Sequence, residues 1–151
     1  LGIDYPREQV ERAVQMASFD SVVAKLPQGY ASDIREKGVN LSGGEKQRLA
    51  LSRGLLAGFD SDILVMDEPT SSLDIRTEAA VLESVFDTFK DKTLIVAVHR
   101  LHVLPQFDRI WVMDRGSLIA DGTFPDLMAA GGAFAELWRK YQGIVDEGRV
   151  E

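Results

Sequence analysis

The sequence predicts an α/β fold built around a parallel sheet. Two continuous apolar runs, ILVMDE at 63–68 and TLIVAVH at 93–99, have the composition of strands that are buried on both faces. A helical pattern of apolar residues separates them, and this strand–helix–strand order requires a crossover and hence a parallel pair. Residues 1–58 show no strand pattern, so we expect a helical subdomain portion there and the strand-containing core in residues 59–151.

Composition sets limits on function. The 151 residues are 45% hydrophobic and 27% charged, as in ordinary globular proteins. Cysteine is absent, which excludes disulfides and thiolate metal sites, and no apolar run approaches the roughly 20 residues that cross a bilayer. The net charge of −7 comes from an acidic excess after residue 58, and no basic stripe marks a nucleic-acid surface. We therefore expect no nucleic-acid partner.

The first part of the chain predicts two helices and a loop. Pro6 suits the first turn of a helix that runs to about Ser18, with apolar residues at helical spacing. Residues 26–40 contain Pro and two Gly without any period, which predicts a long loop. A second helix is expected to begin at Ser42 and to stop near Gly58.

The later part predicts helices and strands in alternation. Asp74 is placed to cap the helix between the two apolar runs. The apolar stripe of that helix is expected to comprise Ile75, Ala79, Leu82, Phe86 and Phe89. Residues 109–122 predict two strands joined by a turn at 114–117. Two short helices follow, the first capped near Thr123 and the pair separated by Gly131 and Gly132.

Two adjacent glycines, Gly43 and Gly44, open the helix that begins at Ser42. Ser42 and Glu45 match a capping box, but the box does not explain the glycines, and each glycine costs a helix about 1 kcal/mol relative to alanine. Glycines without Cβ atoms would let an anion approach the N–H groups at the positive helix end. By itself this short pattern favours a plain capped helix, and an anion cradle is the alternative that the motifs after it then favour.

Acidic residues and a histidine follow the two apolar runs. Asp67 would lie at the carboxyl edge of a parallel sheet, where such folds bind ligands, and its carboxylate could hold Mg²⁺. Glu68 could orient an attacking water or act as a base. His99, expected to end the second strand, could bond a terminal phosphate. The alternatives are a solvated acidic pair and a structural histidine, and we assign His102 a structural role.

Together these motifs resemble the second half of an ATP-binding cassette (ABC) nucleotide-binding domain, which has a P-loop NTPase-like fold. LSGGEKQR at 41–48 resembles the family signature and ILVMDE its Walker B strand. SSLD at 71–74 resembles the D-loop, and VHR at 98–100 resembles the switch-histidine segment. The motifs occur in the family's order and cover nearly all of the chain.

The resemblance implies an ATPase that uses ATP and Mg²⁺. Ser42, Gly43 and Gly44 would contact the γ-phosphate of ATP held by the opposite subunit of a head-to-tail dimer. The full set of signature and D-loop residues assigned to cofactor binding comprises Leu41, Ser42, Gly43, Gly44, Glu45, Gln47 and Asp74. Asp74 would bridge the dimer interface. Asp67 would support Mg²⁺, Glu68 would be the catalytic carboxylate, and His99 would be the catalytic phosphate sensor.

The segment before the signature resembles that of exporter-type cassettes, where an acid near Glu36 lies close to the transmembrane domains. The resemblance therefore implies a transporter on the cytoplasmic face of a membrane, with a second nucleotide-binding domain and transmembrane domains as partners. Residues 122–138 resemble the exporter C-terminal pattern. Pro69, Ser72 and Phe124 depart from residues common in exporters.

The sequence contains no G-x-x-x-x-G-K-[ST] loop and does not begin with Met. We therefore expect a C-terminal fragment of an exporter-type cassette that lacks the Walker A half and binds ATP poorly by itself. A cassette fragment of a soluble ABC ATPase of DNA repair, chromosome maintenance or translation is one alternative. A stand-alone module that binds a partner cassette and catalyses nothing is another.

Overall fold

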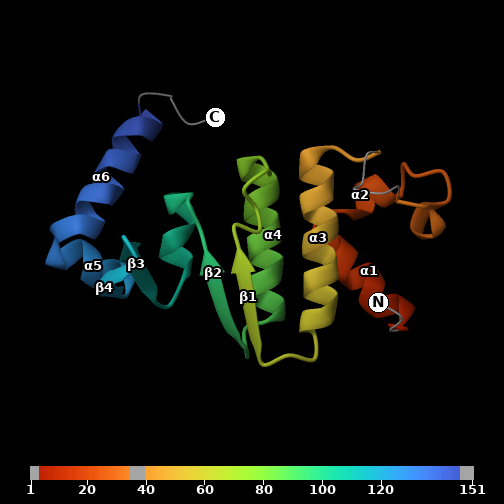
Figure 1. The fold of residues 1–151 in the computed structure, drawn as a ribbon, viewed down its shortest axis with the longest axis horizontal. Helices are drawn as coiled ribbons and strands as arrows, with labels where there is room; N and C mark the ends of the chain where they lie inside the picture. Colours follow the sequence, from red (N-terminus) through yellow and green to blue (C-terminus); the bar gives the residue numbers. More distant parts are fainter. Residues whose placement is uncertain (1–3, 35–39, 147–151) are drawn as a thin grey trace. The chain divides into compact units, whose positions relative to one another are not determined.

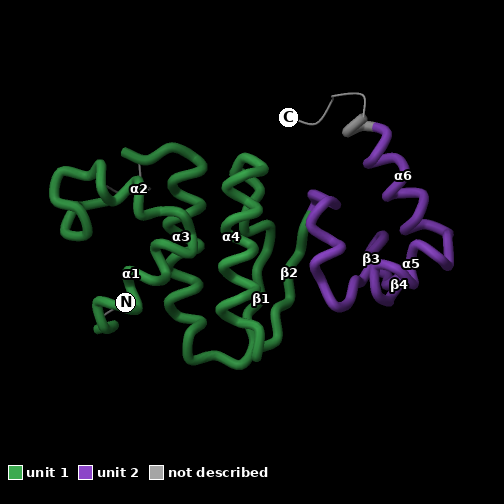
Figure 2. Tube along the Cα trace, turned by 180° about the vertical axis from the view of Figure 1, so that it is seen from behind, with its two compact units in different colours: residues 1–98 green, residues 99–151 purple. Residues whose placement is uncertain are grey.

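A computed structural model describes residues 4–34 and 40–146 of the chain. The chain forms two compact units, Leu1–Val98 and His99–Glu151, which Figure 2 distinguishes by colour. The boundary expected at residue 58 concerns the subdomains of a cassette and stays a prediction. Within these 151 residues, the helices before residue 58 pack together with the strand pair in one unit.

Helices make up most of the first unit (Figure 1). The elements are α1 (Arg7–Met16), α2 (Asp20–Val23), η1 (Gly29–Ala31), α3 (Gly43–Gly58) and α4 (Ile75–Thr88). Pro6 lies at the N-cap of α1 rather than inside it, and the helix ends two residues before Ser18, which has a positive φ of 51°. The sequence did not predict α2, and η1 lies inside the segment that was predicted as a loop. Glu36 lies outside the described residues.

Strands β1 (Ile63–Asp67) and β2 (Thr93–Ala97) pair in parallel, which confirms the predicted sheet. The register aligns Leu64 with Leu94 and Asp67 with Ala97. The prediction that both faces are buried is wrong for these residues. Leu64 is 7% exposed, whereas Val65, on the opposite face, is 74% exposed. The reason is that the helices of the first unit cover one face of the pair, so the side chains alternate between core and surface.

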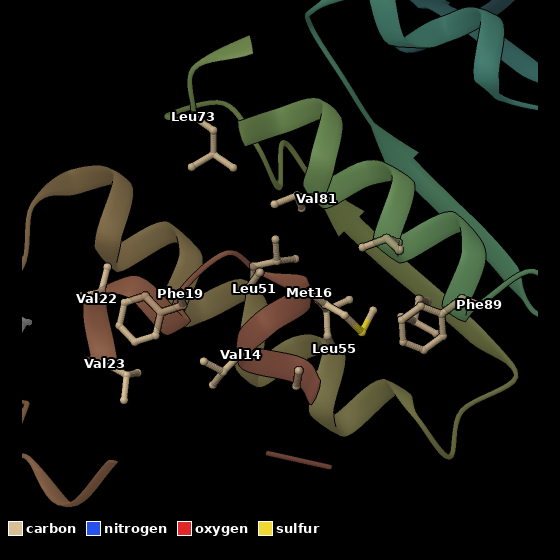
Figure 3. Packing of buried hydrophobic residues seen from close by; sticks show 14 of the residues in the cluster. Val14, Met16, Phe19, Val22, Val23, Leu51, Leu55, Leu73, Val81 and Phe89 are labelled. Atoms are coloured by element: carbon tan, nitrogen blue, oxygen red, sulfur yellow. The ribbon is translucent and has the colours of Figure 1, made fainter. Parts of the chain in front are cut away.

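The core of the first unit lies between α1, α3, α4 and the inner face of the strand pair. Figure 3 shows Met16 of α1, Leu55 of α3 and Phe89, the C-cap of α4, meeting in this core, and all three are at most 6% exposed. The expected stripe of α4 is partly wrong, because Ile75 and Ala79 are exposed. The fully buried face of α4 and its C-cap consists of Glu78, Val81, Leu82, Val85 and Phe89.

The second unit consists of η3 (Leu101–Gln106), β3 (Ile110–Asp114), β4 (Ser117–Gly122), α5 (Phe124–Ala130) and α6 (Gly132–Asp146). The predicted hairpin is confirmed, and its turn places Arg115 and Gly116 at positive φ values of 47° and 77°. Thr123 caps α5 and Gly131 separates the two helices, as predicted, whereas Gly132, predicted to lie between them, is the first residue of α6. None of the described helices combines the length and apolarity needed to cross a membrane.

Candidate functional site

The N-terminus of α3 carries the predicted capping box. The backbone N–H of Ser42 donates to Glu45 Oε2 at 2.7 Å, and the N–H of Glu45 donates to Ser42 Oγ at 3.3 Å. The bond from the Ser42 backbone lowers the pKa of the Glu45 carboxyl below its ordinary value of 4.5. Ser42 and Gly43 are exposed to solvent, whereas the neighbouring Leu41 is only 8% exposed. The serine and the first glycine therefore present a positive helix end to solvent.

The two glycines of the signature have different surroundings. Neither has a positive φ, so backbone conformation does not require glycine at either position. A Cβ atom on Gly43 would meet nothing within 4 Å, whereas a Cβ atom on Gly44 would lie 3.2 Å from the backbone oxygen of Ser72. Gly44 thus lets a loop of its own chain approach α3 closely. Gly43 leaves its space open to solvent.

Gln47, one turn further along α3, holds the same loop. Its Nε2 donates to the carbonyl oxygen of Glu68 at 3.0 Å and to Ser71 Oγ at 2.7 Å. Its Oε1 accepts from the backbone N–H of Ser72 at 2.8 Å. The side chain of Gln47 therefore joins the signature helix to the loop after β1.

β1 ends at Asp67, at the carboxyl edge of the strand pair, and Glu68 follows it directly; both residues are exposed. The N–H of Glu68 donates to the carbonyl of Ala97 in β2 at 3.0 Å, so the residue after β1 is still bonded to the neighbouring strand. Glu68 has a φ of 45°. A positive φ is costly for a residue with a side chain, and the following proline restricts Glu68 further. Such strain at an exposed carboxylate is typical of functional positions.

The loop continues from Pro69 into α4. The Thr70 hydroxyl donates to Glu78 Oε1 at 2.6 Å, and both residues are buried, at 4% and 2% exposed. Asp74 caps α4 as predicted, since its carboxylate accepts from the N–H and the hydroxyl of Thr77 at 3.0 and 2.7 Å. The hydroxyl and then the N–H of Thr77 lower the pKa of Asp74. This intrachain capping uses the carboxylate that the family resemblance assigns to a dimer interface.

The two histidines lie in the second unit. β2 ends at Ala97, so the prediction that His99 ends the strand is wrong by two residues; His99 is exposed. Val98 and His99 follow the last β1–β2 pair, Asp67 with Ala97, because the ladder stops there. His102 Nδ1 lies 3.0 Å from the Tyr141 hydroxyl, in agreement with a structural role. The sensor role of His99 stays a prediction.

The carboxylates at the end of β1 suit a magnesium ion that is held mainly by phosphate. The described residues contain no cluster of three or more acidic, histidine or cysteine side chains that could bind a metal alone. Mg²⁺ at nucleotide sites commonly takes only one or two protein carboxylates, with water and phosphate oxygens completing the shell. Asp67, exposed and at the carboxyl edge of parallel strands, fits that requirement. The ligand role of Asp67 stays a prediction.

Sequence reasoning missed two contacts that shape this region. Gln47 was assigned to the cofactor through its motif, but its bonds to the loop after β1 depend on tertiary contact and leave no sequence signal. Glu78 did leave one, since it lies on the face of α4 that also carries Val81 and Val85. An acid on an apolar face indicates a buried partner, here Thr70.

The parallel strand pair with exposed acids at its carboxyl end, and the capped glycine helix bonded to the loop beyond, define part of an α/β nucleotide-binding cassette. The sequence pattern of the family described as ABC transporter matches residues 4–71. A bacterial Atm1-family ABC exporter with ATP bound superposes with a TM-score of 0.81 at 38% identity, covering 89% of this chain and 23% of that one.

Two curated relatives agree with the family. The ATP-dependent lipid A-core flippase of Vibrio cholerae is 41% identical over 136 residues, and the mycobactin import ATP-binding/permease protein IrtB of Mycolicibacterium smegmatis is 38% identical over 139 residues. These matches cover 90% and 92% of this chain but 23% and 24% of the relatives. The chain is therefore similar to ABC transporters over nine-tenths of its length, and it corresponds to the later part of the nucleotide-binding domain. It spans about a quarter of the relatives' length.

Proposed function

We propose that this chain is the part of an ABC transporter ATPase that supplies the catalytic carboxylate to one ATP and the signature to another. The observation that carries the proposal is the junction of α3 with the loop after β1. There, an exposed capped helix end and the strained, exposed Glu68 are tied together by Gln47. The resemblance to an ATP-bound exporter supports the assignment of both features to nucleotide.

At the end of β1, the two acids have different tasks in this proposal. Asp67 holds Mg²⁺, which supplies charge neutralisation at the phosphates when bound. Glu68 orients the attacking water and accepts its proton. Asp67 is the last residue of the strand, whereas Glu68 follows it at a positive φ, so the two neighbouring carboxylates need not share one task. His99 senses the terminal phosphate.

At the other end of the junction, α3 receives the ATP of a second cassette. Ser42 offers a hydroxyl, and Gly43 leaves room for a phosphate because, among the described residues beyond its own helix turn, nothing lies within 4 Å of its Cβ position. The positive end of the 16-residue α3 favours that negative charge. Leu41 and Glu45 support this end, the first by burial and the second through the capping box.

We further propose that the cassette acts at the cytoplasmic face of a membrane, coupled to transmembrane helices and to a second nucleotide-binding domain. The flippase and the Atm1-family exporter favour export as the direction of transport. One relative is named for import, so the direction rests on the exporter fold rather than on every relative.

The test is ATP hydrolysis by the complete gene product that carries this chain. Glu68→Gln removes the basic carboxylate while preserving its size, and the proposal expects kcat to fall by about 100-fold or more with ATP binding retained. Glu83→Gln is the matched control, since it makes the same change at an exposed position of α4. Hydrolysis by Glu68→Gln at the level of the Glu83→Gln control would exclude the proposed role.

A further inference from the structure

Gln47 makes three hydrogen bonds to one short loop, and the chemistry of its partners fixes the orientation of its amide. The Ser72 N–H can only donate, so the atom 2.8 Å from it must be Oε1. The Glu68 carbonyl can only accept, so the atom 3.0 Å from it must be Nε2. Both assignments agree, and both N–H groups of the amide are then used, the second on Ser71 Oγ at 2.7 Å.

The loop that Gln47 holds is also restrained on its other sides. Gly44 brings the α3 backbone to the Ser72 carbonyl, where a Cβ atom would lie at only 3.2 Å. Thr70 bonds to the buried Glu78 of α4. The loop from Glu68 to Ser72 is therefore clamped between α3 and α4. On the α3 side, the neutral side chain of Gln47 makes three hydrogen bonds to this loop.

We propose that Gln47 is a positioning residue for Glu68, and that it makes the α3 terminus and the Glu68 carboxylate move as one body. Its bond to the Glu68 carbonyl acts on the very residue whose backbone is held at a φ of 45°. The inference rests on the proposed function, in which the α3 terminus and Glu68 serve different ATP molecules. Engagement of the helix end by one nucleotide is then transmitted through Gln47 to the carboxylate that acts on the other.

Two substitutions distinguish the hydrogen bonds that Gln47 accepts from those that it donates. Gln47→Leu keeps much of the side-chain volume and removes all three hydrogen bonds. Gln47→Glu keeps an acceptor for the Ser72 N–H but places an oxygen, instead of a donor, against the Glu68 carbonyl. Gln15→Leu is the matched control, because Gln15 is an exposed glutamine on a helix of the same unit.

The first measurement is amide hydrogen exchange at Ser72 in this chain. Loss of a typical hydrogen bond predicts that the Ser72 amide exchanges at least roughly fivefold faster in Gln47→Leu than in the wild type. The rate should change little in Gln47→Glu and in Gln15→Leu. Exchange at Ser72 that is unchanged in Gln47→Leu would overturn the clamp, whatever the protein's activity.

The second measurement is ATPase kinetics of the complete gene product. We expect both Gln47 variants to lower kcat about tenfold at an unchanged KM for ATP, while Gln15→Leu matches the wild type in both. Faster exchange at Ser72 with an unchanged kcat would overturn the positioning role while leaving the clamp intact. The proposed function has its own test: hydrolysis by Glu68→Gln at the wild-type rate would exclude it. The positioning role of Gln47 would then be excluded as well.

Discussion

The four glycines of α3 have different surroundings, and these predict how alanine at each position changes the stability of the chain. They occupy positions 43, 44, 54 and 58, and none has a positive φ, so each can become alanine without backbone strain. What differs is the space at each Cβ. An added Cβ atom would have open space at Gly43 and Gly54. At Gly44 it would lie 3.2 Å from the Ser72 carbonyl oxygen, and at Gly58 it would lie 2.8 Å from Leu64 Cδ2.

The magnitudes follow from helix propensity and overpacking. Gly54→Ala, in the middle of the helix and in open space, should raise the free energy of unfolding by about 1 kcal/mol. Gly58→Ala gains less at the helix end and forces Leu64 to move, at a cost of about 1–3 kcal/mol, so the net effect is a loss. Gly44→Ala presses on a backbone atom that is held by hydrogen bonds, so it should be less stable than Gly43→Ala by about 1 kcal/mol or more.

The assay is urea unfolding of the four variants of this chain, followed by the circular dichroism of its helices. At constant m-value, Gly54→Ala should have the highest urea midpoint and Gly43→Ala the next highest. Gly44→Ala and Gly58→Ala should have the lowest midpoints. Equal midpoints for Gly43→Ala and Gly44→Ala would refute the close approach of α3 to the loop. A gain for Gly58→Ala would refute the packing of α3 against β1.

Two further predictions concern single acids. Glu68→Gly should raise the free energy of unfolding by about 1 kcal/mol, because glycine adopts a φ of 45° without the cost to a side chain, while ATP hydrolysis is lost; a destabilised variant in thermal unfolding would contradict the strain. Glu45 has a folded-state pKa below its ordinary value of 4.5, so its contribution to stability is complete above that value and is lost as pH falls through the folded pKa. Unfolding measured from pH 6 to pH 3 should therefore show a smaller loss of stability in Glu45→Gln, and parallel curves for variant and wild type would contradict the effect.

The sequence predicted helix caps and turns better than it predicted which side chains are buried between elements. The Ser42 capping box and the Asp74 cap depend on residues within one turn, and the hairpin turn depends on Arg115 and Gly116, so their patterns are complete in the sequence. The exposure of Val65 and of Ile75 depends on which elements pack against each face, and an apolar run in the sequence does not predict that.

The candidate site shows the same division. The motifs located Asp67, Glu68 and the α3 terminus, because spacing along the chain places acids at a strand end and glycines at a helix start. The sequence could not predict that Gly43 faces open space while Gly44 packs against the backbone, because the difference depends on the carbonyl of Ser72, 28 residues after Gly44. The bonds of Gln47 were missed for the same reason.

The central claim is that the α3 terminus and Glu68 of one chain serve two different ATP molecules, and mixed dimers test it most directly. Ser42→Arg fills the open helix end with a large cation, and Glu68→Gln removes the catalytic carboxylate; each variant alone should hydrolyse almost no ATP. A dimer of one Ser42→Arg subunit and one Glu68→Gln subunit retains one site with both groups intact, so the account predicts ATPase activity well above that of either variant alone. Activity in the mixed dimer no greater than in the separate variants would contradict it.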